Sequence, residues 1–259
     1  MRLSVVIPAR NEEENLVETV PAIARALRSE GIAYQIVIVD DDSSDGTAAV
    51  VERLGRSDSG VELVRNTGRH GYGLAVRAGL RAAQGDAIAV MMADGSDRPA
   101  DLVGYYRALE RGYDCAFGSR FMRGSSLTKY PRHKLVLNRL GNLFIRTLFG
   151  LRYNDVTNAF KCYRREVIQA MEPLISPHFN LTVEMPLKAI IRGCSYAVMP
   201  IGWSGRQIGV SSLKIKEMGS RYLFIVLYLW LEKHLSRGDY RRDSHVPAPD
   251  AAETGHVRP

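Results

Sequence analysis

The clearest chemical signal in the sequence is an acidic turn at residues 39–47, which runs Val-Asp-Asp-Asp-Ser-Ser-Asp-Gly-Thr. Its consecutive aspartates, Asp40 to Asp42, would repel one another unless a positive or hydrogen-bonding group is held among them. A nucleotide supplies such groups, because carboxylates accept hydrogen bonds from ribose hydroxyls and from a base N–H. Capping of a following helix would account for one or two of these polar residues but not for the whole turn. We therefore interpret the turn as a nucleotide-binding site.

A second pair of carboxylates, Asp94 and Asp97, follows an apolar run at residues 87–92. Carboxylate oxygens are suitable ligands for Mg²⁺ or Mn²⁺, and a diphosphate that leaves a substrate needs its charge neutralised. The alternative is a reverse turn built on Asp94 and Gly95. We expect the two aspartates to hold a divalent metal and to take part in catalysis.

The positive charge of the chain is concentrated in one segment. The net charge is +7, yet residues 115–154 alone contain eight Lys or Arg and no Asp or Glu. Such a segment must face an anionic partner or pair with acids elsewhere. We find no nucleic-acid-binding motif and no regular interleaving of aromatic residues, so an anionic membrane surface or a phosphorylated lipid fits better than nucleic acid. Arg120 and Arg132 are the candidate phosphate contacts within the segment, because a guanidinium suits oxyanions.

The elements that must position these groups alternate between strands and helices. Short apolar runs predict buried strands at residues 3–7, where Pro8 stops the run, and at 36–39, 61–64 and 87–92. Helical spacing of apolar residues predicts helices at residues 11–27, 44–54 and 71–83. This alternation is typical of an α/β protein with a parallel sheet covered by helices on both faces. Ligands bind at the carboxyl ends of such strands, where Pro8, Asp40 and Asp94 fall.

Two later segments are amphipathic. Residues 130–149 mix basic and apolar residues in a pattern that suits a membrane interface, although packing against a core would explain the apolar stripe equally well. Residues 222–231 form an apolar run that would reach only about 15 Å as a helix, which is too short to cross a bilayer. We expect a globular unit at residues 1–218, an amphipathic membrane-associating helix at 219–237 and a disordered tail at 238–259.

Five motifs in order carry a resemblance to family 2 glycosyltransferases. They are Ile-Pro-Ala-Arg-Asn-Glu at residues 7–12, the acidic turn at 39–47, a glycine-rich helix entry at 66–79, Gly-Ser-Arg-Phe at 118–121 and Asp-Val-Thr-Asn-Ala-Phe at 155–160. The last two resemble the polyprenyl-phosphate (dolichol-phosphate) mannosyltransferase branch. The resemblance implies an A-type glycosyltransferase fold, with a mostly parallel Rossmann-like sheet. It also implies that the residues binding the nucleotide sugar are Pro8, Arg10, Glu12, Asp40, Asp42, Gly71 and Asp94.

The resemblance extends to the acceptor side, with two departures from the family pattern. Alignment on Pro99 places Ala93 and Gly95 where the family has its Asp-Ala-Asp carboxylates, and Asp94 matches the first of them only after a one-residue shift. Ser212 stands where the family's Arg-x-x-Gly-x-Ser-Lys segment has its lysine. By resemblance, the catalytic group also includes Arg120 and Glu184, and the phosphate or acceptor contacts are Arg120, Arg132, Arg206, Ser211 and Lys214.

Together these features predict inverting transfer of a sugar from GDP-mannose or a UDP-hexose to a polyprenyl phosphate. The expected partners are a nucleotide-sugar donor, a lipid-phosphate acceptor and the membrane surface. A homo-oligomer or a membrane-protein partner stays open.

Three scattered cysteines and the absence of a signal-peptide pattern indicate a cytoplasmic protein associated peripherally with the inner membrane face. The alternatives are a soluble glycosyltransferase acting on a hydroxyl, with Asp97 or Glu184 as base, and a non-catalytic nucleotide-sugar-binding protein.

Overall fold

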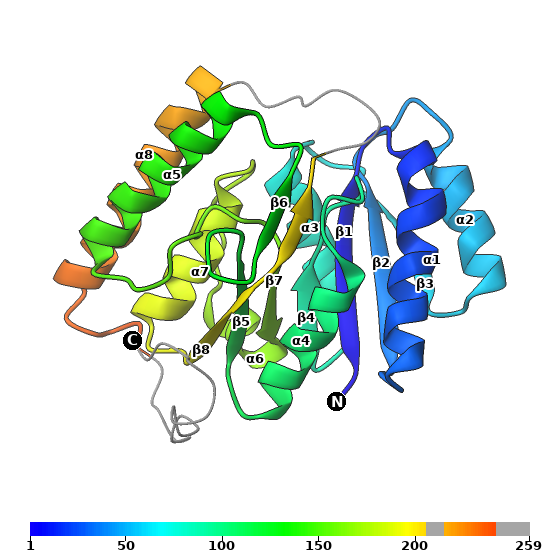
Figure 1. Ribbon diagram of the computed structural model, residues 1–259, viewed down its shortest axis with the longest axis horizontal. Helices are drawn as coiled ribbons and strands as arrows, with labels where there is room; N and C mark the ends of the chain where they lie inside the picture. The colour runs from blue at the N-terminus through cyan, green and yellow to red at the C-terminus, as the bar shows by residue number, and fades with distance from the viewer. Residues whose placement is uncertain (206–214, 242–259) are drawn as a thin grey trace.

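A mixed sheet forms the centre of the molecule in the computed structural model, which describes residues 1–205 and 215–241 (Figure 1). Its strands are β1 (Leu3–Ala9), β2 (Tyr34–Asp40), β3 (Val61–Arg65), β4 (Ala87–Val90), β5 (Cys115–Ser119), β7 (Lys161–Arg164) and β8 (Tyr196–Pro200). They lie side by side in the order β3-β2-β1-β4-β7-β5-β8. All neighbouring pairs are parallel except those of β7, which runs antiparallel to β4 and β5. The predicted α/β class and mostly parallel sheet are therefore confirmed.

Helices cover both faces of the sheet. They are α1 (Glu13–Ser29), α2 (Thr47–Ser57), α3 (Tyr72–Ala82), α4 (Pro99–Glu110), α5 (Arg132–Phe149), α6 (Arg165–Ala170), α7 (Leu181–Ile191) and α8 (Ile215–Leu235). One buried core joins α1, α2 and α4 to one face of the sheet. A second buried core joins α3, α5, α6, α7 and α8 to the other face. Alternate residues of β1 divide between the cores, because successive side chains of a strand point to opposite faces. Val6 lies in one core, whereas Val5 and Ile7 lie in the other.

The first strand runs further than its sequence indicated. Pro8 was expected to end it, yet β1 continues to Ala9 and pairs with β2 as far as Asp40. Proline lacks an N–H and is therefore excluded from most ladder positions. On the other side of β1, however, the ladder with β4 ends at Val6, whose carbonyl accepts from the N–H of Met91. Pro8 follows that last bond, so the sheet loses nothing by its missing donor.

Helices α5 and α8 lie side by side on one flank of the molecule (Figure 1). Helix α8 begins at Ile215, before the boundary expected at residue 219, and packs against α7 through Ile225, Val226 and Leu229. The opposite side of α8 leaves large apolar residues such as Phe224 in contact with solvent. A helix therefore covers most of the expected range and one side of it belongs to the core, whereas its association with a membrane stays a prediction. No helix in the described ranges has the length and apolar character needed to cross a bilayer.

Beside the main sheet, a small parallel pair of strands joins two distant parts of the chain. β6 (Ser126–Thr128) pairs with β9 (Gly202–Ser204), and Leu127 lies opposite Trp203. The three cysteines are buried thiols, as expected of small core residues. Residues 242–259, where a disordered tail was expected, lie outside the described residues.

The segment before α7 packs tightly against the start of α3. The N–H groups of Gly73 and Leu74 both donate to the carbonyl of Pro177. A Cβ added at Gly73 would lie 2.3 Å from the carbonyl oxygen of Ser176 and 2.8 Å from the carbonyl carbon of Pro177. These are backbone atoms that no side-chain rotation can move away. The contact therefore requires glycine and holds residues 176–178 against α3.

We predict that Gly73→Ala destabilises the protein by about 1–3 kcal/mol, because the backbone around Pro177 must move to admit the methyl group. The matched control is Gly141→Ala within α5, where an added Cβ meets nothing within 4 Å. That change should leave stability unaltered or raise it by about 0.5–1 kcal/mol through helix propensity. Urea unfolding measures both. Equal midpoints for the two variants would contradict the close contact at Gly73.

Candidate active site

The carboxylates of the acidic turn find many of their partners within the protein. Asp40 and Asp41 are buried. The carboxylate of Asp40 accepts from the N–H of Ser43. Asp41 accepts from the side-chain amide of Asn66 at 2.6 Å and from the N–H of Gly71 at 2.9 Å. The charge repulsion that suggested a ligand is thus relieved in part by neighbouring donors, and Asp41 serves to attach the loop between β3 and α3.

The second half of the turn binds the loop that follows β1. Ser43 accepts from the N–H of Asn11, whose side chain in turn accepts from the N–H of Ser44. The hydroxyl of Thr47 accepts from the N–H of Glu12 at 2.9 Å. Asp45 accepts from the N–H groups of Glu13 and Thr47. Internal hydrogen bonds therefore explain more of the motif than helix capping alone.

The candidate nucleotide contacts lie in these joined loops. Pro8 is near the end of β1, and Arg10 is exposed just beyond it. Asp42 keeps 64% of its side chain exposed and has a left-handed backbone with φ of 63°. Gly71, with φ of 149°, could not hold a Cβ because it would meet the carbonyl oxygen of Pro177 at 2.6 Å. The fold thus brings the ends of β1 and β2 together, as the sequence predicted, and joins the loop after β3 to them. The contacts of these loops with a nucleotide stay predictions.

His70 is a residue of this region that sequence reasoning set aside. Its Nδ1 lies 3.5 Å from Asp41 and its Nε2 lies 3.6 Å from Asp42. The imidazole therefore stands between two carboxylates of the acidic turn. No spacing in the sequence signals this contact, because His70 reaches the turn only through the loop that Asp41 attaches.

Asp94 and Asp97 lie in the loop that follows β4. Asp97 is 4% exposed and accepts from the N–H of Met92 at 3.1 Å. Burial raises the pKa of Asp97 to about 7, and the charge of Asp94 adds to this increase. Asp94 accepts from the N–H of Ser96, as in the turn considered from the sequence. A buried carboxylate with a raised pKa beside a second carboxylate is a site at which a cation would be stabilised.

Asp94 and Asp97 alone could hold a metal ion only if the substrate supplied further ligands. Across residues 1–205 and 215–241, no three His, Cys, Asp or Glu side chains gather as a complete set of ligands. Mg²⁺ commonly takes one or two carboxylates together with phosphate oxygens of the substrate. The residues present therefore fit a metal that arrives with, or is completed by, a diphosphate.

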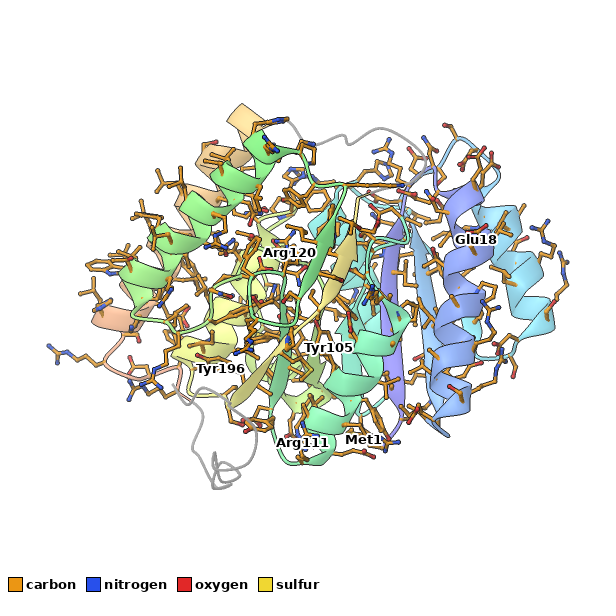
Figure 2. All side chains as sticks on the ribbon, in the orientation of Figure 1. Met1, Glu18, Tyr105, Arg111, Arg120 and Tyr196 are labelled. Carbon is orange, nitrogen blue, oxygen red and sulfur yellow. The ribbon has the colours of Figure 1, made fainter. Side chains whose placement is uncertain are left out.

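Arg120 is engaged by a carboxylate that the sequence did not single out. Its Nε and Nη2 donate to the two carboxylate oxygens of Asp155 at 2.8 and 2.7 Å, and its backbone N–H donates to the same group. Arg120 lies in the middle of the molecule (Figure 2) and is 8% exposed. Burial opposes its charge, but Asp155 outweighs this effect and raises the pKa. Asp155 therefore occupies one edge of the guanidinium, and the phosphate contact expected of Arg120 stays a prediction.

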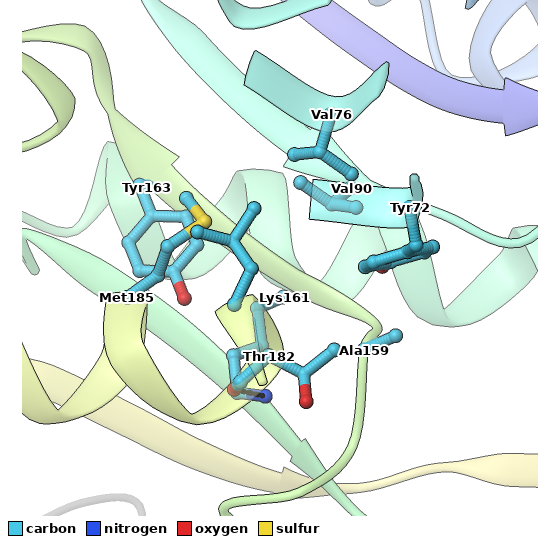
Figure 3. Close-up of a pocket in the computed structure, with 9 residues that line it drawn as sticks. Tyr72, Val76, Val90, Ala159, Lys161, Tyr163, Thr182 and Met185 are labelled. Atoms are coloured by element: carbon cyan, nitrogen blue, oxygen red, sulfur yellow. Dashed lines mark hydrogen bonds between the residues drawn. The ribbon is translucent and has the colours of Figure 1, made fainter. Parts of the chain in front are cut away.

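Lys161 is another buried cation near this pair. Its ammonium donates to the carbonyl oxygens of Val156, Asn158 and Thr182. Burial lowers the pKa of Lys161 to about 7, while three carbonyl acceptors match the three hydrogens of the charged form. Lys161 and Thr182 line one side of a cavity of about 10 Å³, opposite Val76 and Val90 (Figure 3). The cavity has room for about one water molecule and is too small for a substrate.

Glu184 has a structural role in place of the predicted catalytic one. It is fully buried on α7, where it forms an ion pair with Lys188 at 2.9 Å. Its two oxygens accept from the N–H groups of Ile175 and Ser176 at 2.8 and 2.7 Å. The carboxylate therefore holds the segment that packs on α3, and neither oxygen is available to take a proton from an acceptor. The family resemblance singled out Glu184, but it could not show that the segment before α7 encloses the carboxylate.

The remaining predicted contacts fall at the edge of the site or outside it. Arg132 is exposed at the first turn of α5, immediately after Pro131. Glu12 is buried in the loop after β1 and accepts from the side-chain amide of Asn15. Arg206, Ser211 and Lys214 lie outside the described residues, and their roles stay predictions.

Comparison with known proteins identifies the family. Residues 4–171 match the model of "Glycosyl transferase family 2". The chain belongs to this family. It is therefore a glycosyltransferase, as expected from its motifs, and family membership favours catalysis over the alternative of a non-catalytic binding protein.

Curated relatives in this family include lipid-phosphate mannosyltransferases. The chain is 34% identical over 220 residues to the polyprenol monophosphomannose synthase of Mycolicibacterium smegmatis, covering 82% of this chain and 81% of that protein. It is 32% identical to the dolichol-phosphate mannosyltransferase of Pyrococcus furiosus, covering 74% of this chain but only 57% of the relative. Identity to the undecaprenyl-phosphate mannosyltransferase of Micrococcus luteus is 28%, over 82% of this chain and 88% of that protein.

Solved structures agree on the fold. Glucosyl-3-phosphoglycerate synthase from Mycobacterium tuberculosis, in complex with UDP, superposes with a TM-score of 0.66 over 90% of this chain and 79% of that chain. A complex of the same enzyme with Mn²⁺, UDP and glucosyl-3-phosphoglycerate gives a TM-score of 0.65, with 90% and 79% covered. Sequence identity is 18% and 17%, respectively, so the similarity supports the A-type glycosyltransferase fold alone.

The buried pair of Arg120 and Asp155 generates a stability prediction. Asp155→Asn removes the charge that compensates a guanidinium with 8% exposure, so we expect a loss of about 3–5 kcal/mol in the free energy of unfolding. The control is Glu52→Gln, which breaks the ion pair of Glu52 with Arg65 at the surface and should cost about 1 kcal/mol or less. Denaturant unfolding compares the two variants. Similar losses would show that the buried pair does not stabilise this site.

Proposed function

We propose that the chain transfers a hexose from a nucleotide sugar to a polyprenyl phosphate, with GDP-mannose as the first candidate donor and a UDP-hexose as the second. The observation that carries the proposal is the position of α5. This helix is basic and leaves apolar side chains exposed. It begins at Arg132, two residues after Tyr130, whose ring centroid lies 5.8 Å from the guanidinium of Arg120. The lipid-phosphate mannosyltransferases among the relatives support the same substrate class.

The donor nucleoside would bind in the joined loops at the ends of β1 to β3. Asp40 and Asp42 supply acceptors for ribose or base hydrogens, and Pro8, Arg10 and Glu12 line the neighbouring loop. Gly71, at the start of α3, stays a further candidate contact of the donor. Asp41 acts indirectly by holding the loop that carries Gly71.

Asp94 and Asp97 would hold the divalent metal together with the diphosphate of the donor. The metal would neutralise the charge of the leaving diphosphate. Mn²⁺ and Mg²⁺ complexes of the Mycobacterium tuberculosis enzyme support the choice of metal. Arg206 and Lys214 stay candidates for further phosphate contacts.

The acceptor phosphate needs no general base, because its oxygen is already anionic at neutral pH. That oxygen forms a bond to the anomeric carbon while the bond from this carbon to the diphosphate breaks, and the leaving oxygen takes the electron pair. The configuration inverts in a single displacement. Catalysis then depends on positioning and on neutralising the leaving charge, which agrees with the structural assignment of Glu184.

A hydroxyl acceptor is the second candidate, and one observation favours it. Such an acceptor must lose a proton, and a pKa of about 7 would make Asp97 a suitable general base at neutral pH. Glu184, the other predicted base, is not available because its oxygens are engaged. Turnover assays that compare a short prenyl phosphate with the corresponding prenol separate the two candidates.

Turnover itself tests the role of Asp97. We expect the protein to convert GDP-mannose and a short prenyl phosphate only with Mg²⁺ or Mn²⁺, and Asp97→Asn to lower kcat/KM about a hundredfold, or about 2.7 kcal/mol of transition-state stabilisation. Asp86→Asn is the control, because Asp86 is exposed just before β4, at the end of that strand opposite to Asp97, and its carboxylate accepts from the N–H of Arg2. Full activity of Asp97→Asn, or activity in EDTA, would contradict the proposed metal site.

Peripheral membrane association is the second part of the proposal. Exposed apolar side chains lie on both flanking helices: Val136, Leu137, Leu140, Leu143 and Phe144 on α5, and Leu223, Phe224, Leu227 and Leu231 on α8. Basic residues of α5 lie among them. A surface that combines apolar area with positive charge suits an anionic bilayer, and a lipid acceptor would be presented from that bilayer.

We predict that Phe144→Ser and Leu140→Ser each reduce binding to phosphatidylglycerol vesicles by roughly tenfold, since each removes a buried apolar side chain from the bound state. Val17→Ser is the control, because Val17 is 45% exposed on α1, away from α5 and α8. Co-sedimentation at low and high salt measures the affinity. Unchanged binding by the α5 variants would contradict this docking surface.

A further inference from the structure

Two aromatic rings stand between the predicted metal loop and the start of α5. Tyr130 lies between β6 and α5, and Trp203 lies in β9. Their ring centroids are 4.9 Å apart. Both side chains are half-buried, and neither belongs to the two buried cores of the described residues. The pair is therefore an aromatic surface that packing of the fold does not account for.

The backbone of Trp203 is tied to the metal loop. Trp203 forms an antiparallel bridge with Asp97, and the N–H of Ser204 donates to the carbonyl of Ser96 at 3.0 Å. On the other side, Gly205 donates to Thr128 at 2.9 Å, next to the segment that carries Tyr130. The rings are thus held at a defined place relative to Asp97.

Two guanidinium groups lie beside the same aromatic group, and one of them, that of Arg120, is held in place by Asp155. The guanidinium of Arg120 lies 5.8 Å from the ring centroid of Tyr130 and 5.3 Å from that of Phe121. Arg139, exposed on α5, lies 5.0 Å from the ring of Phe121. Apolar aromatic faces beside guanidinium groups match a ligand in which an anion is joined directly to hydrocarbon.

We propose that Tyr130 and Trp203 form the binding surface for the first isoprene unit of the prenyl phosphate acceptor. This inference rests on the proposed function and deepens it. The phosphate would lie toward Asp97 and Arg120, while the hydrocarbon would pass over the rings toward the exposed apolar side of α5. Trp203 then fixes how far the acceptor enters, so that its phosphate oxygen meets the anomeric carbon. It is a positioning and specificity-determining residue.

Stacking on the donor sugar is the other use of an aromatic pair beside Asp97. The observations favour hydrocarbon because Tyr130 leads through Pro131 directly into α5, whose exposed face carries Val136 and Leu140. A hydrocarbon chain can continue along that face, whereas a sugar ring would end at the aromatic pair. The two uses predict opposite effects on the KM values of donor and acceptor.

The first test measures KM for both substrates, with GDP-mannose as donor and citronellyl or geranyl phosphate as acceptor. We expect Trp203→Leu to raise the acceptor KM about tenfold, as one apolar face of a five-carbon unit is lost, and to leave the donor KM within about twofold. Trp203→Phe keeps a flat ring and should recover most of the affinity. The matched control is Trp230→Phe on α8, which should change neither KM.

The second test does not depend on turnover. The sequence has only two tryptophans, so Trp230→Phe leaves Trp203 as the single tryptophan reporter. We expect its fluorescence to change when citronellyl phosphate is added in the presence of GDP and Mg²⁺, and not with inorganic phosphate at the same concentration. This measurement stays informative if Trp203→Leu fails to fold.

The outcomes separate this inference from the proposed function. A fluorescence response to prenyl phosphate without turnover would support the binding surface and contradict the transferase proposal. Turnover of prenyl phosphate with an unchanged acceptor KM in Trp203→Leu would support the transferase and overturn the inference. A raised donor KM in that variant, or a fluorescence response to GDP-mannose alone, would also overturn it and assign the rings to the sugar.

Discussion

The ion pair between Arg120 and Asp155 sits where the different parts of the site meet. Arg120 follows β5, and Asp155 lies in the segment that leads to β7, so the pair ties two neighbouring strands together at one edge. Because both groups are buried, the pair is favourable only with complete hydrogen bonding, and the backbone N–H of Arg120 adds a third bond. These hydrogen bonds fix the guanidinium of Arg120 beside the ring of Tyr130, and the proposed acceptor side of the site depends on that position.

Charged residues around the site divide into those that hold loops and those that remain for a ligand. Asp41 holds the loop before α3, and Glu184 with Lys188 holds the segment before α7. Asp97 differs from them, because burial and a neighbouring carboxylate keep its charge costly without a cation. In a site built from many acids, the number of carboxylates therefore overstates the number that can bind substrate. Their hydrogen-bond partners distinguish the two groups.

The sequence was most informative where local pattern and topology agree. Strands β1 to β4 were predicted correctly, because a buried apolar run fills each of them. Their alternation with helices implied a parallel sheet. Strands β5 and β7 of the main sheet were not predicted from the sequence. β5 and β7 lie around a basic segment with little periodicity, and β7 enters between β4 and β5 although it comes later in the chain. Such insertion is a long-range choice that no local spacing records.

By itself, the sequence determined the fold class, the family and the loops in which the acidic groups lie, because strand ends and motif order are local properties. Only the tertiary structure decided what each charge does. Glu184 forms a buried ion pair with Lys188, and Arg120 forms one with Asp155. Trp203 lies beside Asp97 in a β-bridge. These partners are far apart in the chain or depend on burial. The cost of burying a charge or a polar group is set by its three-dimensional surroundings, which residue type and spacing do not specify.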